Sequence, residues 1–184
     1  MGYAAAGMFT LILATAGSAY GQALDTSASP GKRLAIAADC VACHTAPGGK
    51  AFAGGYPLES PMGTIYSTNI TPSKTAGIGD YTEAQFARAV RDGVTADGTH
   101  LYPAMPYTSY SKMTDSDIAA LYDYFMHEVQ PVDTTPAKTA LDFPFNVRAS
   151  MIGWNALYHS EKRFTPDPAK SADVNRGDYL VNGL

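Results

Sequence analysis

The residues with the clearest chemical potential form the pentapeptide Cys40-Val41-Ala42-Cys43-His44. The C-x-x-C-H spacing is typical of covalent haem attachment, because two thiols one helical turn apart can add to the two vinyl groups of a porphyrin. The histidine that follows then lies under the iron. We therefore expect thioether bonds from Cys40 and Cys43 and proximal iron ligation by Nε2 of His44, whose Nδ1–H needs an acceptor that fixes the ring.

Other uses of the cysteine pair fit the sequence less well. A thioredoxin-like redox pair would lie in a βαβ unit, and no such pattern surrounds these residues. A zinc site needs four ligands, and the remaining histidines (His100, His127 and His159) show no H-x-H pairing at metal-site spacing. Two cysteines this close together close no stabilising disulfide loop. Of the three remaining histidines, we expect His127 and His159 at the surface.

A six-coordinate iron needs a second axial ligand on the far face of the haem. A methionine thioether fills this position in Met/His-ligated cytochromes c and raises the potential. Met105 is the favoured candidate because it lies in a stiff, non-helical segment, YPAMPY at 102–107, whose prolines fix the backbone. His100 is the rival as an imidazole ligand. The other methionines after the motif are Met62, Met113, Met126 and Met151.

The haem propionates need hydrogen-bond donors, and the first long loop contains several polar side chains. Tyr66, Ser67, Thr68 and Asn69 follow one another in this loop, and each carries a hydroxyl or amide donor. We predict possible propionate contacts for Tyr66, Ser67 and Asn69. The alternative is ordinary turn chemistry, for which asparagine is well suited.

The elements that must position these residues are predicted to be three helices separated by long loops. Ser29 and Pro30 begin a helix that runs into the cysteine pair. Thr82 opens a capping box for a second helix that ends at Gly93, and an apolar stripe from Ile118 predicts a third. Glycines and prolines break residues 45–81, 94–113 and 130–173 into loops with few evident strands. We expect a mainly α fold of the class I cytochrome c type, wrapped around one covalent haem c.

The N-terminal region indicates export. Residues 1–24 carry no charge and include an apolar run that ends in small residues, which predicts a signal peptide over 1–23. No lysine or arginine precedes the run, and an uncleaved anchor is the alternative. The chain has 184 residues, a net charge of −4 and only 16% charged residues, which argues against a nucleic-acid binder.

With these residues in place, the sequence resembles the class I cytochromes c. It is most similar to the three-haem cytochrome c subunit of membrane-bound bacterial dehydrogenases that oxidise alcohols, gluconate, sorbitol or fructose. The resemblance implies a protein on the periplasmic side of the cytoplasmic membrane. It also implies that the protein accepts electrons from a dehydrogenase subunit and passes them towards ubiquinone. The matching stretches are 39–50, 52–55, 63–72, 102–110 and 113–127.

One departure from that pattern concerns the number of haems. The sequence holds one C-x-x-C-H motif, whereas three are expected in the family. Residues 175–184 resemble the segment that leads into the second motif. We therefore expect a cytochrome c domain over 29–130, a linker or extended tail over 131–174, and the start of a truncated second haem domain over 175–184.

The predicted chemistry is outer-sphere electron transfer with both axial ligands retained, so no acid–base catalytic residue is expected. Two alternatives have the same haem: a stand-alone carrier with one haem, and a haem enzyme whose sixth ligand can exchange. A third hypothesis gives the aromatic tail, 143–158, a role in docking a dehydrogenase subunit. The substrate of that partner does not follow from these residues.

Overall fold

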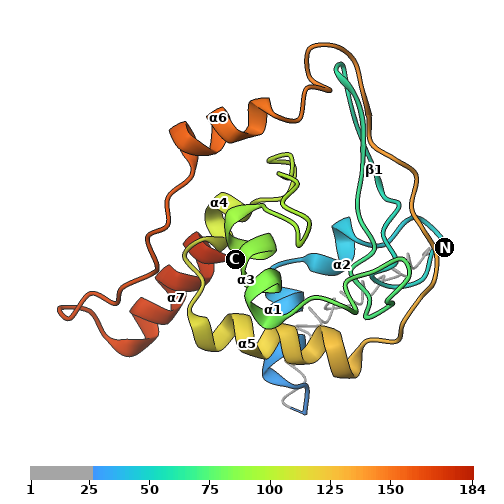
Figure 1. The fold of residues 1–184 in the computed structure, drawn as a ribbon. Coiled ribbons are helices and arrows are strands. Elements are labelled where there is room, and N and C mark those ends of the chain that lie inside the picture. The colour runs from blue at the N-terminus through green and yellow to red at the C-terminus, as the bar shows by residue number, and fades with distance from the viewer. Residues whose placement is uncertain (1–26) are drawn as a thin grey trace, which may run out of the picture.

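The computed structural model describes residues 27–184 and combines a group of helices with a small antiparallel sheet (Figure 1). The predicted signal peptide lies outside the described residues. The elements are α1 (Pro30–Ala37), α2 (Cys40–Cys43), β1 (Pro57–Ser60), β2 (Gly63–Tyr66), α3 (Glu83–Asp92), α4 (Tyr107–Tyr110), α5 (Asp115–Asp123), the π-helical turn η1 (Tyr124–Glu128), β3 (Ala140–Leu141), α6 (Ser150–Tyr158) and α7 (Ala172–Gly183).

The predicted helix starts are confirmed. The Ser29 side chain accepts a hydrogen bond from the Lys32 amide at the start of α1. Thr82 and Gln85 form the reciprocal capping box of α3, and Gly93 ends that helix with a φ of 63°. Such local hydrogen bonds satisfy backbone groups that would otherwise lack a partner, so nearby sequence alone specifies them.

The sequence predicted that the first helix runs unbroken into the cysteine pair, and the structure shows that it does not. It ends at Ala37, and Asp39 takes a left-handed conformation with a φ of 52° before the single turn α2 begins. An aspartate tolerates this conformation better than most residues. Because of this break, the cysteines lie on a separate helical turn, and the buried face of α1 does not fix their direction.

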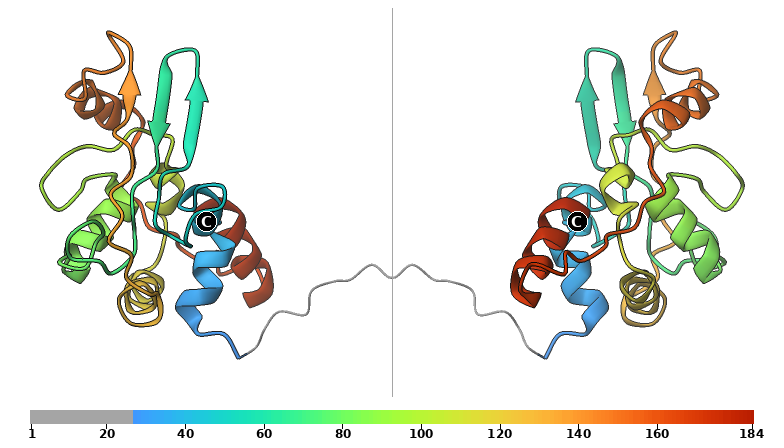
Figure 2. Two further views of the ribbon diagram at one scale, coloured as in Figure 1. Left: turned by 90° about the vertical axis from the view of Figure 1, so that its right-hand side faces the viewer. Right: turned by 90° about the vertical axis from the view of Figure 1, so that its left-hand side faces the viewer.

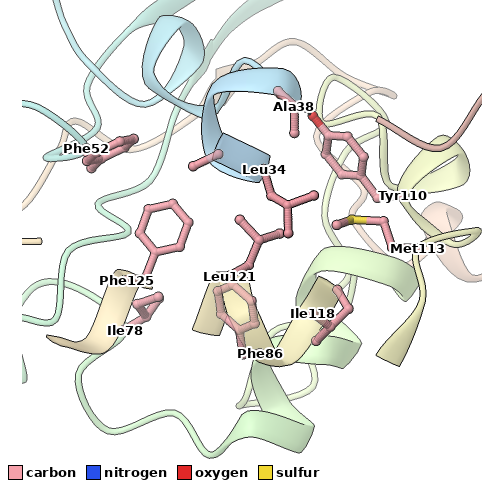
Figure 3. Packing of buried hydrophobic residues seen from close by; sticks show 11 residues of the cluster. Leu34, Ala38, Phe52, Ile78, Phe86, Tyr110, Met113, Ile118, Leu121 and Phe125 are labelled. Carbon is pink, nitrogen blue, oxygen red and sulfur yellow. Dashed lines mark hydrogen bonds between the residues drawn. The ribbon is translucent and has the colours of Figure 1, made fainter. Parts of the chain in front are cut away.

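The core lies mainly where α1 meets α5. Leu34 of α1 and Leu121 of α5 point towards each other, and Phe125 continues the contact towards Phe52 (Figure 3). Phe52 and Phe125 meet edge to face with their ring centroids 5.2 Å apart, an arrangement that aromatic pairs favour. The apolar stripe predicted along the third helix is therefore the face that closes this core.

A small sheet of short strands lies within the predicted long loops, in a chain that is mainly helical as expected. Strands β1 and β2 form an antiparallel hairpin, and β3 pairs with β2 in the order β1-β2-β3. Figure 2 shows β3 beside the hairpin, although it follows β2 by more than seventy residues in the chain. Gly63 starts β2 with a φ of 113°. A Cβ at this position would collide with the backbone of Ala140 and Leu141, so the pairing of β2 with β3 requires glycine there.

The segment after the third helix is not irregular throughout. Residues 131–149 run from η1 along the hairpin to α6, which lies at the far end of the molecule from α5 (Figure 1). We call residues 132–148 the strap. Asn155 of α6 accepts a hydrogen bond from the Tyr107 hydroxyl at 2.7 Å, so α6 packs back on the helical part. Residues 172–183 form α7, as predicted for the start of a helix near the C-terminus.

His159 corrects a further expectation. It was predicted at the surface, yet its side chain is only 10% exposed, with Nε2 3.3 Å from a carboxylate oxygen of Asp92. Its ring lies against Tyr107. The reason is tertiary, because the segment after α6 folds over the end of α3. His127 is exposed, as expected. Within residues 27–184 we find no helix with the length and apolar character needed to cross a membrane.

Candidate haem site

A cavity of about 370 Å³ lies between the helices and the hairpin. Its size falls in the range usual for small-molecule and cofactor sites. The side chains that line it are mostly apolar and include Phe86, Leu121 and Phe125 from the core. Cys40, Cys43, His44 and Met105 also line it. The structure thus brings together the residues that sequence spacing selected for haem binding.

The cysteines lie at the two ends of the single turn α2. Both are free, so no disulfide competes for the thiols. Burial raises the pKa of Cys40 to about 12, with smaller contributions from Cys43 and Asp39. Cys40 is therefore a neutral thiol in an apolar wall, and Cys43 is the more exposed of the two. This arrangement fits two side chains that are joined to an apolar macrocycle.

The His44 ring is fixed by the loop that follows the hairpin. Its Nδ1–H donates to the Thr68 carbonyl at 2.7 Å, and since a carbonyl can only accept, the proton is on Nδ1. Nε2 then keeps its lone pair, which is the form in which histidine binds a metal. Burial lowers the pKa of His44, with the Thr68 bond acting in the opposite direction. A neutral, oriented imidazole is the state that iron ligation requires.

Met105 lies on a different loop from His44 but lines the same cavity. Its amide donates to Tyr102, and its carbonyl accepts from Tyr107, so the segment is held at both sides. His100 does not line the cavity, and its Nδ1 lies 3.2 Å from the Asn155 amide nitrogen. Met113 also lines the cavity but is fully buried in the core. These positions support Met105 over His100 as the predicted distal ligand.

The polar residues predicted near the propionates differ in what they can offer. Tyr66 and Ser67 line the cavity, and the Ser67 hydroxyl accepts from the Tyr56 amide at 2.9 Å, which leaves its proton free to donate. Asn69 also lines it, but its amide is fully used. Its Nδ2 donates to the carbonyls of Val132 and Thr134, and its Oδ1 accepts from the amide and the hydroxyl of Thr71. These bonds give Asn69 a structural role, and its propionate contact stays a prediction.

Sequence reasoning missed the contribution of the strap. Thr139 and Arg148 line the cavity as well, and the Thr139 hydroxyl accepts from the Tyr66 amide at 3.3 Å. No motif marks either residue. The only available signal was the aromatic content of the segment, which indicated that it packs against something.

A family model for cytochrome c matches residues 28–128. The chain belongs to the cytochrome c family. The class I fold predicted from the sequence is thereby confirmed, together with covalent haem c as the cofactor. The residues fit this group, because two free thiols, a neutral imidazole with a fixed tautomer and a thioether surround one apolar cavity.

Relatives of this cytochrome c confirm the predicted resemblance. The chain is 55% identical over 160 residues to the fructose dehydrogenase cytochrome subunit of Gluconobacter japonicus, covering 86% of this chain and 33% of the relative. It is 47% identical over 179 residues to the cytochrome c subunit of an alcohol dehydrogenase (quinone) of Gluconacetobacter polyoxogenes, covering 97% and 38%. It is 48% identical over 164 residues to the gluconate 2-dehydrogenase cytochrome c subunit of Pantoea cypripedii, covering 89% and 37%. The chain thus spans little more than a third of these relatives.

Proposed function

We propose that this cytochrome c domain carries electrons from the catalytic subunit of a bacterial dehydrogenase towards ubiquinone, on the periplasmic side of the cytoplasmic membrane. The observation that carries the proposal is the placement of His44 and Met105, from separate loops, on one largely apolar cavity. The relatives named as dehydrogenase cytochrome subunits support the choice of partner. For a whole subunit of this kind the proposal includes three haems, of which residues 29–130 would hold the first.

The bound haem supplies a one-electron Fe(III)/Fe(II) couple. The protein's own residues hold that group still and keep water away. The Thr68 carbonyl holds the His44 ring through Nδ1, and the bonds on both sides of Met105 hold its loop. Apolar walls such as Phe86 and Phe125 limit solvent access, which tunes the potential. No proton has to move at a side chain, so the site needs no acid–base residue.

Carbon monoxide binding to the reduced, haem-loaded protein tests this function. With Met105 retained on the iron, we expect slow and incomplete carbon monoxide binding, while a haem enzyme with an exchangeable sixth ligand would bind it rapidly. The partner is tested separately, by rapid reduction of the cytochrome on mixing with the dehydrogenase subunit and its substrate. Rapid carbon monoxide binding together with no reduction by the dehydrogenase would overturn the proposal.

The same proposal assigns the partner contact to the apolar surface of the segment 143–158. Phe143 and Leu157 in this segment are 79% and 76% exposed. Large exposed apolar side chains that cluster in one segment are typical of interaction surfaces. The other exposed apolar residues of the segment are Phe145, Val147, Ile152 and Tyr158.

A further inference from the structure

Arg148 holds an unusual position in the haem cavity. Among the described residues that line this cavity it is the one lysine or arginine side chain. It lies in the strap, between β3 and α6, and thus outside residues 28–128 that match the cytochrome c family. Arg148 is half-buried, and a cation beside a largely apolar cavity is more stable when a negative group pairs with it.

The guanidinium group is held in place from two sides. Its Nη1 donates to the His100 carbonyl at 2.8 Å, and its central carbon lies 4.3 Å from the centre of the Tyr102 ring. The Tyr102 hydroxyl in turn donates to the Phe145 carbonyl of the strap. Within the described part of the chain these contacts leave Nε and Nη2 of Arg148 without an acceptor. The guanidinium group is therefore held in one orientation, and its Nε and Nη2 can still donate to a ligand.

A second cavity of about 480 Å³ shows which end of the haem site Arg148 occupies. It shares the stretch 66–69, Ala76, Thr139 and Arg148 with the haem cavity, and residues 135–139 form its other wall. Neither cysteine nor His44 lines it. It therefore lies on the side of the haem cavity that the stretch 66–69 and the strap form, and not on the wall that carries the cysteines. Its walls also include the exposed Lys138 and several hydroxyl groups.

Haem chemistry assigns an occupant to that end. A porphyrin joined through its vinyl groups to Cys40 and Cys43 carries its two propionates on the opposite edge. We propose that Arg148 binds a haem propionate through its free fork, so that the strap completes the haem site from outside the family domain. Arginine suits this role, because its planar fork matches a carboxylate and stays charged. The proposal rests on haem binding by this chain, which the proposed function also requires.

The pairing has an electrochemical consequence. A cation beside a propionate offsets negative charge near the iron and disfavours the more positive oxidised state. Net charge and hydrogen bonding around a haem are among the means by which a protein sets its potential. Loss of the Arg148 charge should therefore lower the reduction potential.

The test is a spectroelectrochemical titration of the purified, haem-loaded protein and its variants. We expect Arg148→Gln to lower the ratio of reduced to oxidised protein at a fixed applied potential about tenfold, which corresponds to about 59 mV for a one-electron couple. Arg148→Lys keeps the charge and should lie closer to the native value. Arg163→Gln is the matched control, since Arg163 donates to the Ser111 carbonyl from the same C-terminal region but does not line either cavity.

A native potential in haem-loaded Arg148→Gln would overturn the proposal. An equal fall in Arg163→Gln would do the same, because it would show a general charge effect. If Arg148→Gln does not retain haem, a structure of the haem-loaded native protein decides. A propionate oxygen within about 4 Å of the guanidinium nitrogens supports the pairing, and a longer distance refutes it. Absence of haem from the native protein would instead contradict the proposed function itself.

Discussion

At the scale of single residues, the site depends on one hydrogen bond that sequence spacing cannot specify. The Thr68 carbonyl accepts the Nδ1 proton of His44 at 2.7 Å, although the two residues belong to different loops. That bond selects the tautomer and the ring orientation together, which are the two properties an axial histidine needs. The backbone supplies the acceptor, so a side-chain substitution at Thr68 can leave it in place.

Replacing Met105 with alanine tests the distal ligand. Because the thioether is the predicted sixth ligand, the variant should lose the weak red charge-transfer band of the oxidised protein. Its potential should fall, since methionine ligation raises the potential of a haem. Visible spectroscopy of the purified protein checks the band. Met62→Ala is the control, because Met62 is exposed and does not line the cavity. Retention of the band in Met105→Ala would mean that another methionine is the ligand.

At the scale of elements, the crossing of α1 and α5 is close enough to exclude any side chain at Gly31. A Cβ there would collide with the Ala120 carbonyl and would lie 2.5 Å from Cβ of Tyr124. Ala120 belongs to α5 and Tyr124 to η1, which continues it, and neither contact can give way without moving backbone. The crossing in turn positions α2, which follows α1 after the turn at Asp39.

We expect Gly31→Ala to destabilise the protein by about 1–3 kcal/mol, the usual cost of forcing extra volume into a packed site. Thermal or denaturant unfolding of the haem-loaded protein measures the change. Gly177→Ala is the matched control. It lies in helix α7 with open space around the added methyl group, so it should gain about 1 kcal/mol from helix propensity. Equal stabilities of the two variants would contradict the close crossing.

A pH dependence is expected where the strap meets the first loop. The Ser73 and Thr75 hydroxyls donate to the Asp133 carboxylate at 2.6 and 3.0 Å, and these bonds lower the pKa of Asp133. A lowered folded-state pKa stabilises the fold above the ordinary value of about 3.9. This stabilisation is lost as the pH falls through the lowered value.

Asp133→Asn should therefore flatten the acid side of the stability curve below about pH 4 and reduce stability near neutral pH. Denaturant titrations between acidic and neutral pH measure both effects. Asp142→Asn is the comparison, because no hydrogen bond to its carboxylate is found within residues 27–184. A curve for Asp133→Asn that parallels the native one would show that the two hydroxyl bonds carry no net stabilisation.

At the scale of the whole molecule, the strap and α6 extend the cytochrome domain. Through Val132 and Thr134 the strap satisfies the buried Asn69 amide, and it adds β3 to the sheet. It then leads into α6 and leaves a row of apolar side chains exposed. A segment that is well tied on one side and apolar on the other is suited to holding a partner next to the haem site.

Combining Phe143→Ser with Leu157→Ser should lower co-purification of the dehydrogenase subunit several-fold. The potential and stability should change little, because both side chains are largely exposed. Val181→Ser is the control, since Val181 is 82% exposed on α7, outside the segment 143–158. Undiminished co-purification of the double variant would remove the partner contact from this surface.

The haem chemistry and several helix starts followed from local sequence. A C-x-x-C-H run specifies thioether and imidazole positions within five residues, and caps such as Ser29 and Thr82 act over three or four residues. Because a motif or a cap involves only residues close together in the chain, it acts in the same way in any fold that forms a helix at that position. The family resemblance drew on several such stretches together.

Long-range contacts in the folded chain settle which distant groups complete the site. The strand β3 has two residues, too few for a pattern, and it forms because β2 presents an open edge. Burial of His159, the full use of the Asn69 amide and the position of Arg148 have the same origin. Each depends on a contact made across tens of residues, and such contacts exist only after the chain has folded. The local sequence specifies the haem chemistry that this protein can perform, and long-range packing specifies which side chains surround the haem.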